Sequence, residues 1–176
     1  MARPPVWRGL LVPAGIRLDH FHDVIQAAMG WGGYHLHVFS DGSVEYGSTD
    51  PQTGHRDERS QTLDRLLAGV GDRIRYTYDF GDDWEHEIVL EELSVAAPDI
   101  VYPTCLTGKG ACPPEDCGGV WGYRHLRAVM ADPADEQHQE MLQWLGLETA
   151  SDFDPAYFDI EAVNEALVLC GAYLSR

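Results

Sequence analysis

Residues 75–92 read RYTYDFGDDWEHEIVLEE, and this stretch decides the fold. Apolar residues alternate with polar ones on both sides of an acidic turn, which is the period of a β-strand with one buried face. The turn, residues 80–83, combines a glycine, which tolerates positive φ, with aspartates such as Asp82, which can form an Asx-turn. The stretch therefore predicts a tight antiparallel hairpin at the centre of the sheet. Its alternating residues are Ile74, Tyr76, Tyr78 and Phe80 before the turn, and Trp84, His86, Ile88 and Leu90 after it.

The segments before residue 75 predict further strands and two helices. Helical spacing of apolar residues, turn dipeptides and polar loop composition mark the boundaries. In chain order we expect a strand at 6–12 entered through Pro4-Pro5, a helix at 18–29 ended by Gly30, a hairpin at 34–47 turning at Asp41-Gly42, an exposed loop at 48–61 and a short helix capped by Thr62.

Residues 94–119 are rich in proline and glycine and hold three of the four cysteines, so they predict a long irregular loop that is functional or anchored. The last third of the chain is expected to be helical. The first expected helix spans 122–130. The second is begun by Asp132-Pro133 and stopped by Gly146, with Trp144 on its apolar face. Asp154-Pro155 repeats the cap signature, and the third helix is capped by Asp159, with Val163, Leu167, Cys170 and Leu174 inward.

Strands in the first two-thirds and helices in the last third predict an α+β fold. We expect a mainly antiparallel sheet built from hairpins, with helices packed on it. A length of 176 residues suits a single domain spanning 1–176.

Charge and composition narrow the function classes. The formal net charge is −17, so the surface repels phosphate backbones and nucleic acid is not the expected partner. No apolar run approaches the ~20 residues that span a bilayer, and the proline-broken N-terminus does not resemble a signal peptide. A cytoplasmic location follows by default, where disulfides are not expected.

The hairpin turn carries the first candidate site. Asp79, Asp82 and Asp83 lie around the tip with His86 nearby, and clustered carboxylates hold hard cations. The alternative is that these aspartates only build the turn. His86 shares the alternation of Trp84 and would then be a core histidine, with one of the carboxylates as its hydrogen-bond partner.

His35 and His37 form the second candidate. Two positions apart on an expected strand, they share a face and could bind one metal ion, especially if His86, or His20 and His22 on the first helix, faced the same space. The alternative is that they are structural or surface histidines.

The third candidate is the spacing of Cys105, Cys112 and Cys117. Only the second interval falls within the Cys-x2–4-Cys range of structural zinc sites, and a fourth ligand would have to come from elsewhere. The alternative is that the thiols pack as small hydrophobes. Beside them, Glu115 and Asp116 stand between Pro-Pro and Gly-Gly, where a rigid loop could line a pocket or cap the helix that begins near Gly122.

Several stretches together resemble the plasmid pRiA4b ORF-3-like family. They are YTYDFGDDWEHEIVLE, YPTCLTGKGACPPEDCGGVWGY, the N-terminal PPVWRGLLVP, VIQAAMGW, YHLHVF and the tail WLGLE…FDPAYFDIEAVNEAL. The resemblance covers almost the whole chain. It implies a compact α+β domain of a widespread bacterial and archaeal family that is uncharacterised and offers no catalytic residues to transfer.

Some members of that family carry a transposon-resolvase-like label. A serine resolvase needs a nucleophilic serine beside an arginine cluster and a basic helix-turn-helix, and this sequence offers neither. Family members usually have a further strand before the Pro-Pro, whereas Met1 here precedes Pro4 by three residues. Either the start codon is mis-assigned or the sheet lacks one strand.

The leading functional hypothesis is a non-enzymatic binding module, because no nucleophile elbow or phosphate-binding loop is present. Its recognition surface would lie between the hairpin tip and the Cys105–Gly119 loop, near the aromatics Trp31, Tyr34, Trp121 and Tyr123, which we expect to be exposed. No cofactor is expected beyond a divalent metal ion, and the partner would be a protein or small molecule. The candidate binding residues are Asp79, Asp82, Asp83, Trp84, His86, Glu115, Asp116, Trp121 and Tyr123.

Two alternatives remain open. A metal-dependent hydrolase of phosphoesters or nucleotides would use Asp79, Asp82, Asp83 and His86, with His35 and His37 in support. A DNA-acting protein of plasmids or transposons ranks third, because the net charge opposes it.

Overall fold

The strands form two sheets in the computed structural model, which describes residues 4–49 and 53–174, the last three without side chains. Within this part of the chain, the larger sheet has five strands in the order β4-β3-β2-β5-β6. The smaller sheet pairs β1 with β7. The strands are β1 (Trp7–Leu11), β2 (His37–Ser40), β3 (Glu45–Gly47), β4 (Arg56–Asp57), β5 (Arg73–Tyr78), β6 (Trp84–Val89) and β7 (Thr104–Lys109).

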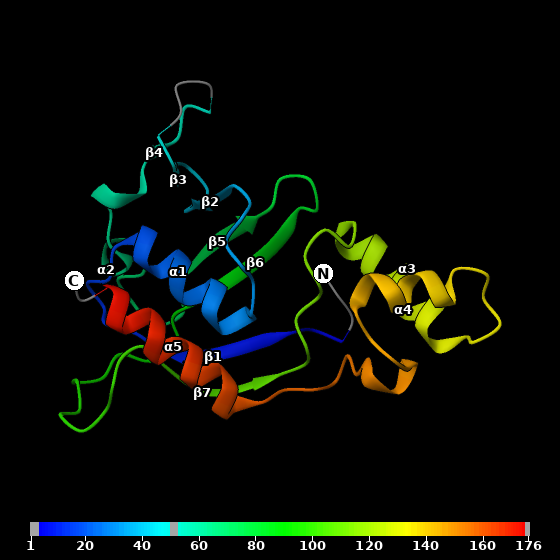
Figure 1. The fold of residues 1–176 in the computed structure, drawn as a ribbon. Helices are drawn as coiled ribbons and strands as arrows, with labels where there is room; N and C mark the ends of the chain where they lie inside the picture. Colours follow the sequence, from blue (N-terminus) through cyan, green and yellow to red (C-terminus); the bar gives the residue numbers. More distant parts are fainter. Residues whose placement is uncertain (1–3, 50–52, 175–176) are drawn as a thin grey trace.

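Helices cover the sheets on one side and form a separate lobe beside them (Figure 1). Helix α1 (Leu18–Met29) lies alongside α5 (Ile160–Leu174), and α5 also packs on β7. Helices α3 (Gly119–Ala131) and α4 (His138–Leu145) contact each other in the lobe. The α+β class expected from the sequence is confirmed, since hairpins build most of the larger sheet and helices fill the last third.

The β5–β6 hairpin is confirmed, and the inward residues of β5 are buried. Tyr76 and Tyr78 are fully buried and Ile74 is nearly so. The last cross-strand pair is Tyr78 with Trp84. Phe80 does not continue the alternation, because the strand ends at Tyr78 and leaves this ring in the turn, 46% exposed. The hairpin is also not central: β2 holds the middle of the sheet and β6 is an edge.

The second hairpin is confirmed at its turn but not at its start. Asp41 Oδ1 accepts the N–H groups of Ser43 and Val44, and β2 pairs with β3 as expected. Strand β2 begins only at His37, so His35 precedes the strand and the two histidines do not share a strand face. Their different surroundings are described below.

Two segments expected to be loops contain regular structure. The polar segment 48–61 includes β4 and a 3-10 turn at Glu58–Ser60, and its residues 50–52 lie outside the described part. The segment 94–119 includes β7, which pairs antiparallel with β1. Gly108 lies within this strand and makes its sequence look like a loop. A Cβ at this position would lie 2.6 Å from the Phe158 ring, so a larger residue would displace that ring.

The C-terminal helices begin later than the Asp-Pro signatures suggest. Asp132 and Asp154 each accept the N–H two residues on, so both dipeptides make turns instead of starting helices. Helix α4 begins at His138 and ends at Gly146 in the left-handed conformation, and Trp144 is half-exposed instead of inward.

The Asp159 cap is confirmed, because its Oδ1 accepts from Glu161 and Ala162. Leu167 is fully buried, Val163 and Cys170 are partly buried, and the Leu174 side chain lies outside the described part.

Candidate functional site

The hairpin tip and the loop at 110–119 form one connected surface. The Tyr78 hydroxyl donates to Glu115 Oε1 at 2.5 Å, and the Gly118 N–H donates to Asp82 Oδ2 at 3.1 Å. The Trp31 indole N–H donates to the Pro113 carbonyl at 3.0 Å. Burial and the bond to Glu115 raise the pKa of Tyr78, so its hydroxyl stays a donor at neutral pH. The loop is therefore anchored to the hairpin, as expected.

Backbone geometry at the tip explains the aspartates and glycines. Asp79 and Asp83 have φ of 57° and 55°, and Asp116 in the facing loop has 58°. The Asx-turn forms at Asp79, whose Oδ1 accepts the Gly81 N–H, and not at Asp82, whose carboxylate reaches the loop. Gly119 cannot carry a side chain, because a Cβ there would lie 2.2 Å from the Asp82 carbonyl oxygen.

His35, Asp79 and Asp116 converge between the tip and the loop. The His35 Nε2 lies 3.3 Å from Asp116 Oδ1 and 3.8 Å from Asp79 Oδ2. One ligand atom from each residue lies within 4.8 Å of the other two. Asp79 is buried and Asp116 is exposed, so the group has one sheltered and one open side.

His37 belongs to a different group. Its Nε2 lies 2.7 Å from Glu58 Oε2, and its ring stacks on that of His22 at 3.6 Å between centroids. The expected His35–His37 metal pair is therefore wrong, because β2 begins between them and sends the rings to different partners.

His86 faces the core and does not reach the hairpin tip. Its Nδ1 lies 2.9 Å from the Trp84 carbonyl, and its ring meets the Trp31 ring edge-on at 5.4 Å. Burial lowers its pKa. The core interpretation is confirmed, the expected carboxylate partner is wrong, and a metal-binding role with the tip aspartates is not supported.

The cysteines behave as packed thiols. Cys105 is buried and its Sγ lies 3.4 Å from the Thr107 carbonyl. Burial raises the pKa of Cys112 and raises that of Cys117 to about 12, so both stay protonated at neutral pH. Among the described residues, no cluster of three metal-binding side chains includes Cys105, Cys112 or Cys117.

The aromatic residues divide into two groups. Tyr34 and Trp121 are 84% and 79% exposed, as expected. Trp31 and Tyr123 are buried, against expectation, because both pack into the hydrophobic core. Trp84 is also buried, and its indole N–H has no hydrogen-bond partner. Of Trp84, Trp121 and Tyr123, only Trp121 is therefore exposed to a partner, and Tyr34 is exposed as well.

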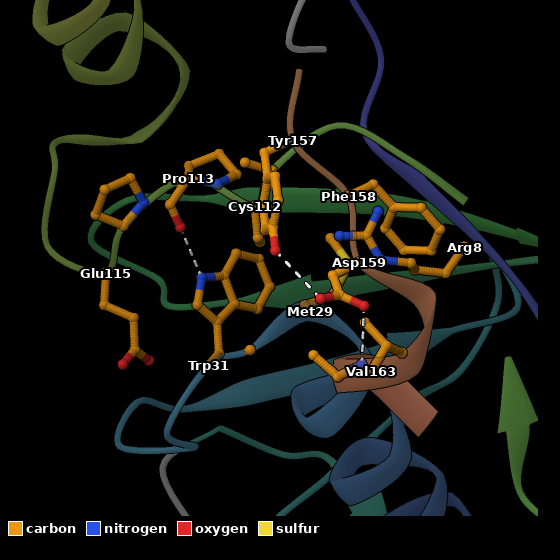
Figure 2. Close-up of a pocket in the computed structure, with 14 residues that line it drawn as sticks. Arg8, Met29, Trp31, Cys112, Pro113, Glu115, Tyr157, Phe158, Asp159 and Val163 are labelled. Carbon is orange, nitrogen blue, oxygen red and sulfur yellow. Dashed lines mark hydrogen bonds between the residues drawn. The ribbon is translucent and has the colours of Figure 1, made fainter. Parts of the chain in front are cut away.

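A pocket of about 350 Å³ is lined in part by the same loop. Figure 2 shows the rings of Trp31, Tyr157 and Phe158 around it, with Arg8 beside Phe158. Glu115 and Asp159 bring carboxylates to the lining, and Cys112, Pro113 and Ala162 add apolar surface. The pocket thus shares Glu115 and Trp31 with the surface that anchors the loop.

Arg8 uses most of its hydrogen-bond donors on backbone carbonyls around this pocket. Its guanidinium donates to the carbonyls of Ala28, Trp7, Lys109 and Gly110. Its Cζ lies 4.5 Å from the centroid of the Phe158 ring. Desolvation lowers its pKa, although the group stays charged at neutral pH. Arg8 therefore shapes the wall and leaves ligand contacts to the rings and carboxylates.

The sequence profile of the plasmid pRiA4b ORF-3-like protein family matches residues 1–162. The chain belongs to this family.

Two similar proteins extend the comparison. An uncharacterized protein, y4hQ, of Sinorhizobium fredii (strain NBRC 101917 / NGR234) is 41% identical over 167 residues, which cover 93% of this chain and 84% of that protein. The crystal structure of a protein of unknown function, MM3350, from Methanosarcina mazei Go1 superposes with a TM-score of 0.80 at 34% identity, covering 92% of this chain and 90% of that one. The first supports the family and the second the fold, and neither name states an activity.

Sequence reasoning about this family member missed most of the pocket. Arg8, Phe158 and Asp159 come from opposite ends of the chain, so no local spacing connects them. The run FDPAYFD predicts a helix start by its aspartates, although aromatic residues such as those it contains are also enriched in binding surfaces. No helix in the part of the chain that the structure describes is long and apolar enough to cross a bilayer.

Proposed function

We propose that this chain is a non-enzymatic binding module whose ligand occupies the pocket lined by Trp31, Tyr157, Phe158, Glu115 and Asp159. The single observation that carries the proposal is the pocket itself. It has a volume of about 350 Å³, and its lining is mostly apolar with a few polar groups, a composition that small-molecule sites share. Its wall is held in place by the bond from Trp31 to Pro113 and by the bond from Tyr78 to Glu115.

The lining favours an aromatic or apolar ligand that carries an amine. A cation is attracted to the faces of aromatic rings and to carboxylates. Each carboxylate has about four acceptor sites, so Glu115 and Asp159 keep capacity beyond their internal bonds. Four of the five N–H donors of Arg8 already bind backbone carbonyls, so the guanidinium offers an anion only one N–H, on Nη2. A net charge of −17 also concentrates cations around the molecule.

The residues expected for a metal-dependent hydrolase do not form one site. Asp82 is bound to the loop backbone, His86 faces the core and His37 is paired with Glu58. Of that set, only Asp79 and His35 remain together. A DNA-acting role is disfavoured by the net charge, and a link to plasmids or transposons stays a prediction.

We place the binding function in the cytoplasm, with which the four free cysteines agree.

Three matched probes test the ligand chemistry. Phenethylamine, phenethyl alcohol and 3-phenylpropionate share a ring and differ in charge. We expect saturation-transfer NMR to show binding of the amine well above that of the alcohol, and none of the carboxylate. The measurement is made in EDTA, so that it reports on the pocket alone.

A blocking variant locates the binding. Ala162 is exposed and lines the pocket, so Ala162→Trp should fill it and abolish the phenethylamine signal. Val168→Trp, on the same helix and outside the lining, is the matched control and should leave the signal intact. Equal binding of all three probes, or a signal that survives Ala162→Trp, contradicts the proposal.

A further inference from the structure

We propose that His35, Asp79 and Asp116 bind one divalent transition-metal ion of the Mn²⁺ or Zn²⁺ class. This site is separate from the pocket and does not depend on the binding function proposed above. It would join three segments: the stretch before β2, the hairpin tip and the loop at 110–119.

The spacing of the donor atoms supports a shared ion. Ligand atoms that each lie about 2.1 Å from one ion are separated from each other by about 3.0–3.4 Å. The His35 Nε2 lies 3.3 Å from Asp116 Oδ1 and 3.8 Å from Asp79 Oδ2, and all three atoms fall within 4.8 Å. Small movements of these side chains would therefore bring all three donor atoms within binding distance of one ion.

Asp79 supplies an independent indication. It is a charged residue with only 8% of its surface exposed. Its Oδ1 accepts the Gly81 N–H, whereas its Oδ2 points toward His35 at 3.8 Å, beyond hydrogen-bond distance. A carboxylate with so little exposure to water is costly unless donors or a cation compensate its charge, and its side chain is only 12% exposed. The unused oxygen is directed into the proposed site.

The local charge points the same way. Within residues 4–49 and 53–174, no lysine or arginine forms an ion pair with Asp79 or Asp116, and His35 is their partner. Asp82 and Asp83 add two further carboxylates at the same tip. Like charges held this close repel one another, and a divalent ion relieves that repulsion.

A second layer of contacts holds the donors in position. The His35 ring meets the Tyr78 ring edge-on, with centroids 5.8 Å apart. The Tyr78 hydroxyl is bound to Glu115, which directly precedes Asp116. Supporting contacts of this kind orient metal ligands and are part of their affinity.

The donor set selects the ion class. Mg²⁺ and Ca²⁺ prefer oxygen ligands alone, whereas one imidazole with two carboxylates suits Mn²⁺ or Zn²⁺. Three protein ligands leave open positions for water, and the exposed Asp116, with 72% of its side chain accessible, puts those positions at the surface.

The test titrates the EDTA-treated full chain with MnCl₂ and follows free Mn²⁺ by electron paramagnetic resonance. Mn²⁺ is the decisive probe, because the thiols of Cys112 and Cys117 have little affinity for this harder ion. We expect one saturable site per chain and a rise in melting temperature with added Mn²⁺. MgCl₂ should compete weakly.

Conservative variants locate the ion. Asp116→Asn and Asp79→Asn keep a side chain that tolerates positive φ, and His35→Phe keeps the ring contact with Tyr78. Each should weaken Mn²⁺ binding at least about tenfold and remove the thermal shift. Asp83→Asn is the matched control, since Asp83 has the same backbone conformation at the same tip and lies outside the cluster.

Two results would overturn the proposal: no saturable Mn²⁺ binding, or a loss in Asp83→Asn equal to that in Asp116→Asn. Ala162→Trp should leave the Mn²⁺ isotherm unchanged, and phenethylamine binding is measured without metal. Failure of the metal site and failure of the pocket are thus separate observations.

Discussion

Glu115 serves two neighbours with its two carboxylate oxygens. Oε1 accepts the hydroxyl of Tyr78 and Oε2 accepts the N–H of Gly32 at 3.3 Å. Tyr78 is fully buried, so its hydroxyl depends on this acceptor. One side chain therefore connects the hairpin, the loop and the segment after α1, and it also lines the pocket.

A double-mutant cycle tests this connection. Glu115→Ala should lower the free energy of unfolding by about 1–3 kcal/mol, because it leaves a buried hydroxyl without an acceptor. Tyr78→Phe removes the hydroxyl and keeps the ring. When both partners are removed, no donor is left unsatisfied, so Tyr78→Phe/Glu115→Ala should be more stable than the sum of the single changes implies. Urea unfolding of the four proteins measures the coupling, and strict additivity would show that the bond contributes nothing.

Candidate residues at this scale were only partly predictable. The sequence placed Asp79, Asp116 and Glu115 near the right surface because turn chemistry and loop composition are local signals. It could not show that His35 rather than His37 faces them, since the choice depends on where β2 begins. Nor could it show that Asp82 bonds the Gly118 backbone, because that contact is made in three dimensions.

At the level of elements, β1 is tied to two others by Arg8. Its guanidinium bonds the Ala28 carbonyl near the C-terminal end of α1 and the Lys109 and Gly110 carbonyls at the end of β7. The last carbonyls of a helix lack intrahelical partners, and a cation there also complements the helix dipole. Arg8 thus fixes how the smaller sheet meets α1.

Arg8→Lys keeps the charge and tests the fork-shaped hydrogen bonding. An ammonium cannot reach four carbonyls arranged for a planar guanidinium, so we expect a loss of at least about 2 kcal/mol in the free energy of unfolding. Arg73→Lys is the control. Arg73 pairs with Glu87 on the surface and should cost almost nothing. Equal effects of the two changes in urea unfolding would show that the Arg8 contacts are not stabilising.

The elements that sequence reasoning found are those with a local signal. Alternation of apolar residues predicts strands β5 and β6. The apolar stripe and Gly30 predict α1, and the Asp159 cap predicts α5. Strand β7 has no such pattern, because its identity as a strand comes from pairing with β1 across most of the chain. The late start of α4 has a similar cause: Asp132 and Asp135 satisfy turns that compete with a helix.

For the whole molecule, we expect acid stability to depend on histidines that are shielded from water and uncharged in the folded chain. His22 is 9% exposed, its Nδ1 lies 2.7 Å from the Tyr76 hydroxyl, and its ring stacks on His37. Burial, with a smaller effect of His37, lowers the pKa of His22 from 6.5 to about 3. Burial also lowers the pKa of His86. Both residues resist protonation in the folded chain.

The sign of the pH dependence follows from proton binding. Between pH 6.5 and about 3, the unfolded chain protonates His22 and the folded chain does not, so stability falls as the pH falls. One such group contributes at most about 1.4 kcal/mol per pH unit. Asp23, whose pKa is raised by burial, opposes this trend as the pH falls from its raised pKa to its ordinary value of 3.8. The histidine effect is therefore clearest between pH 7.5 and 5, where most carboxylates keep their charge.

Calorimetry across that range checks the prediction. The melting temperature should fall from pH 7.5 to pH 5 in the natural chain. His22→Gln cannot be protonated, so it should melt lower at pH 7.5 yet lose less on acidification. His125→Gln, at an exposed histidine, should reproduce the natural pH dependence. Self-repulsion of the net charge is common to the natural chain and the variant, so curves for the His22 variant that run parallel to the natural chain would mean that His22 is not the source of the acid sensitivity.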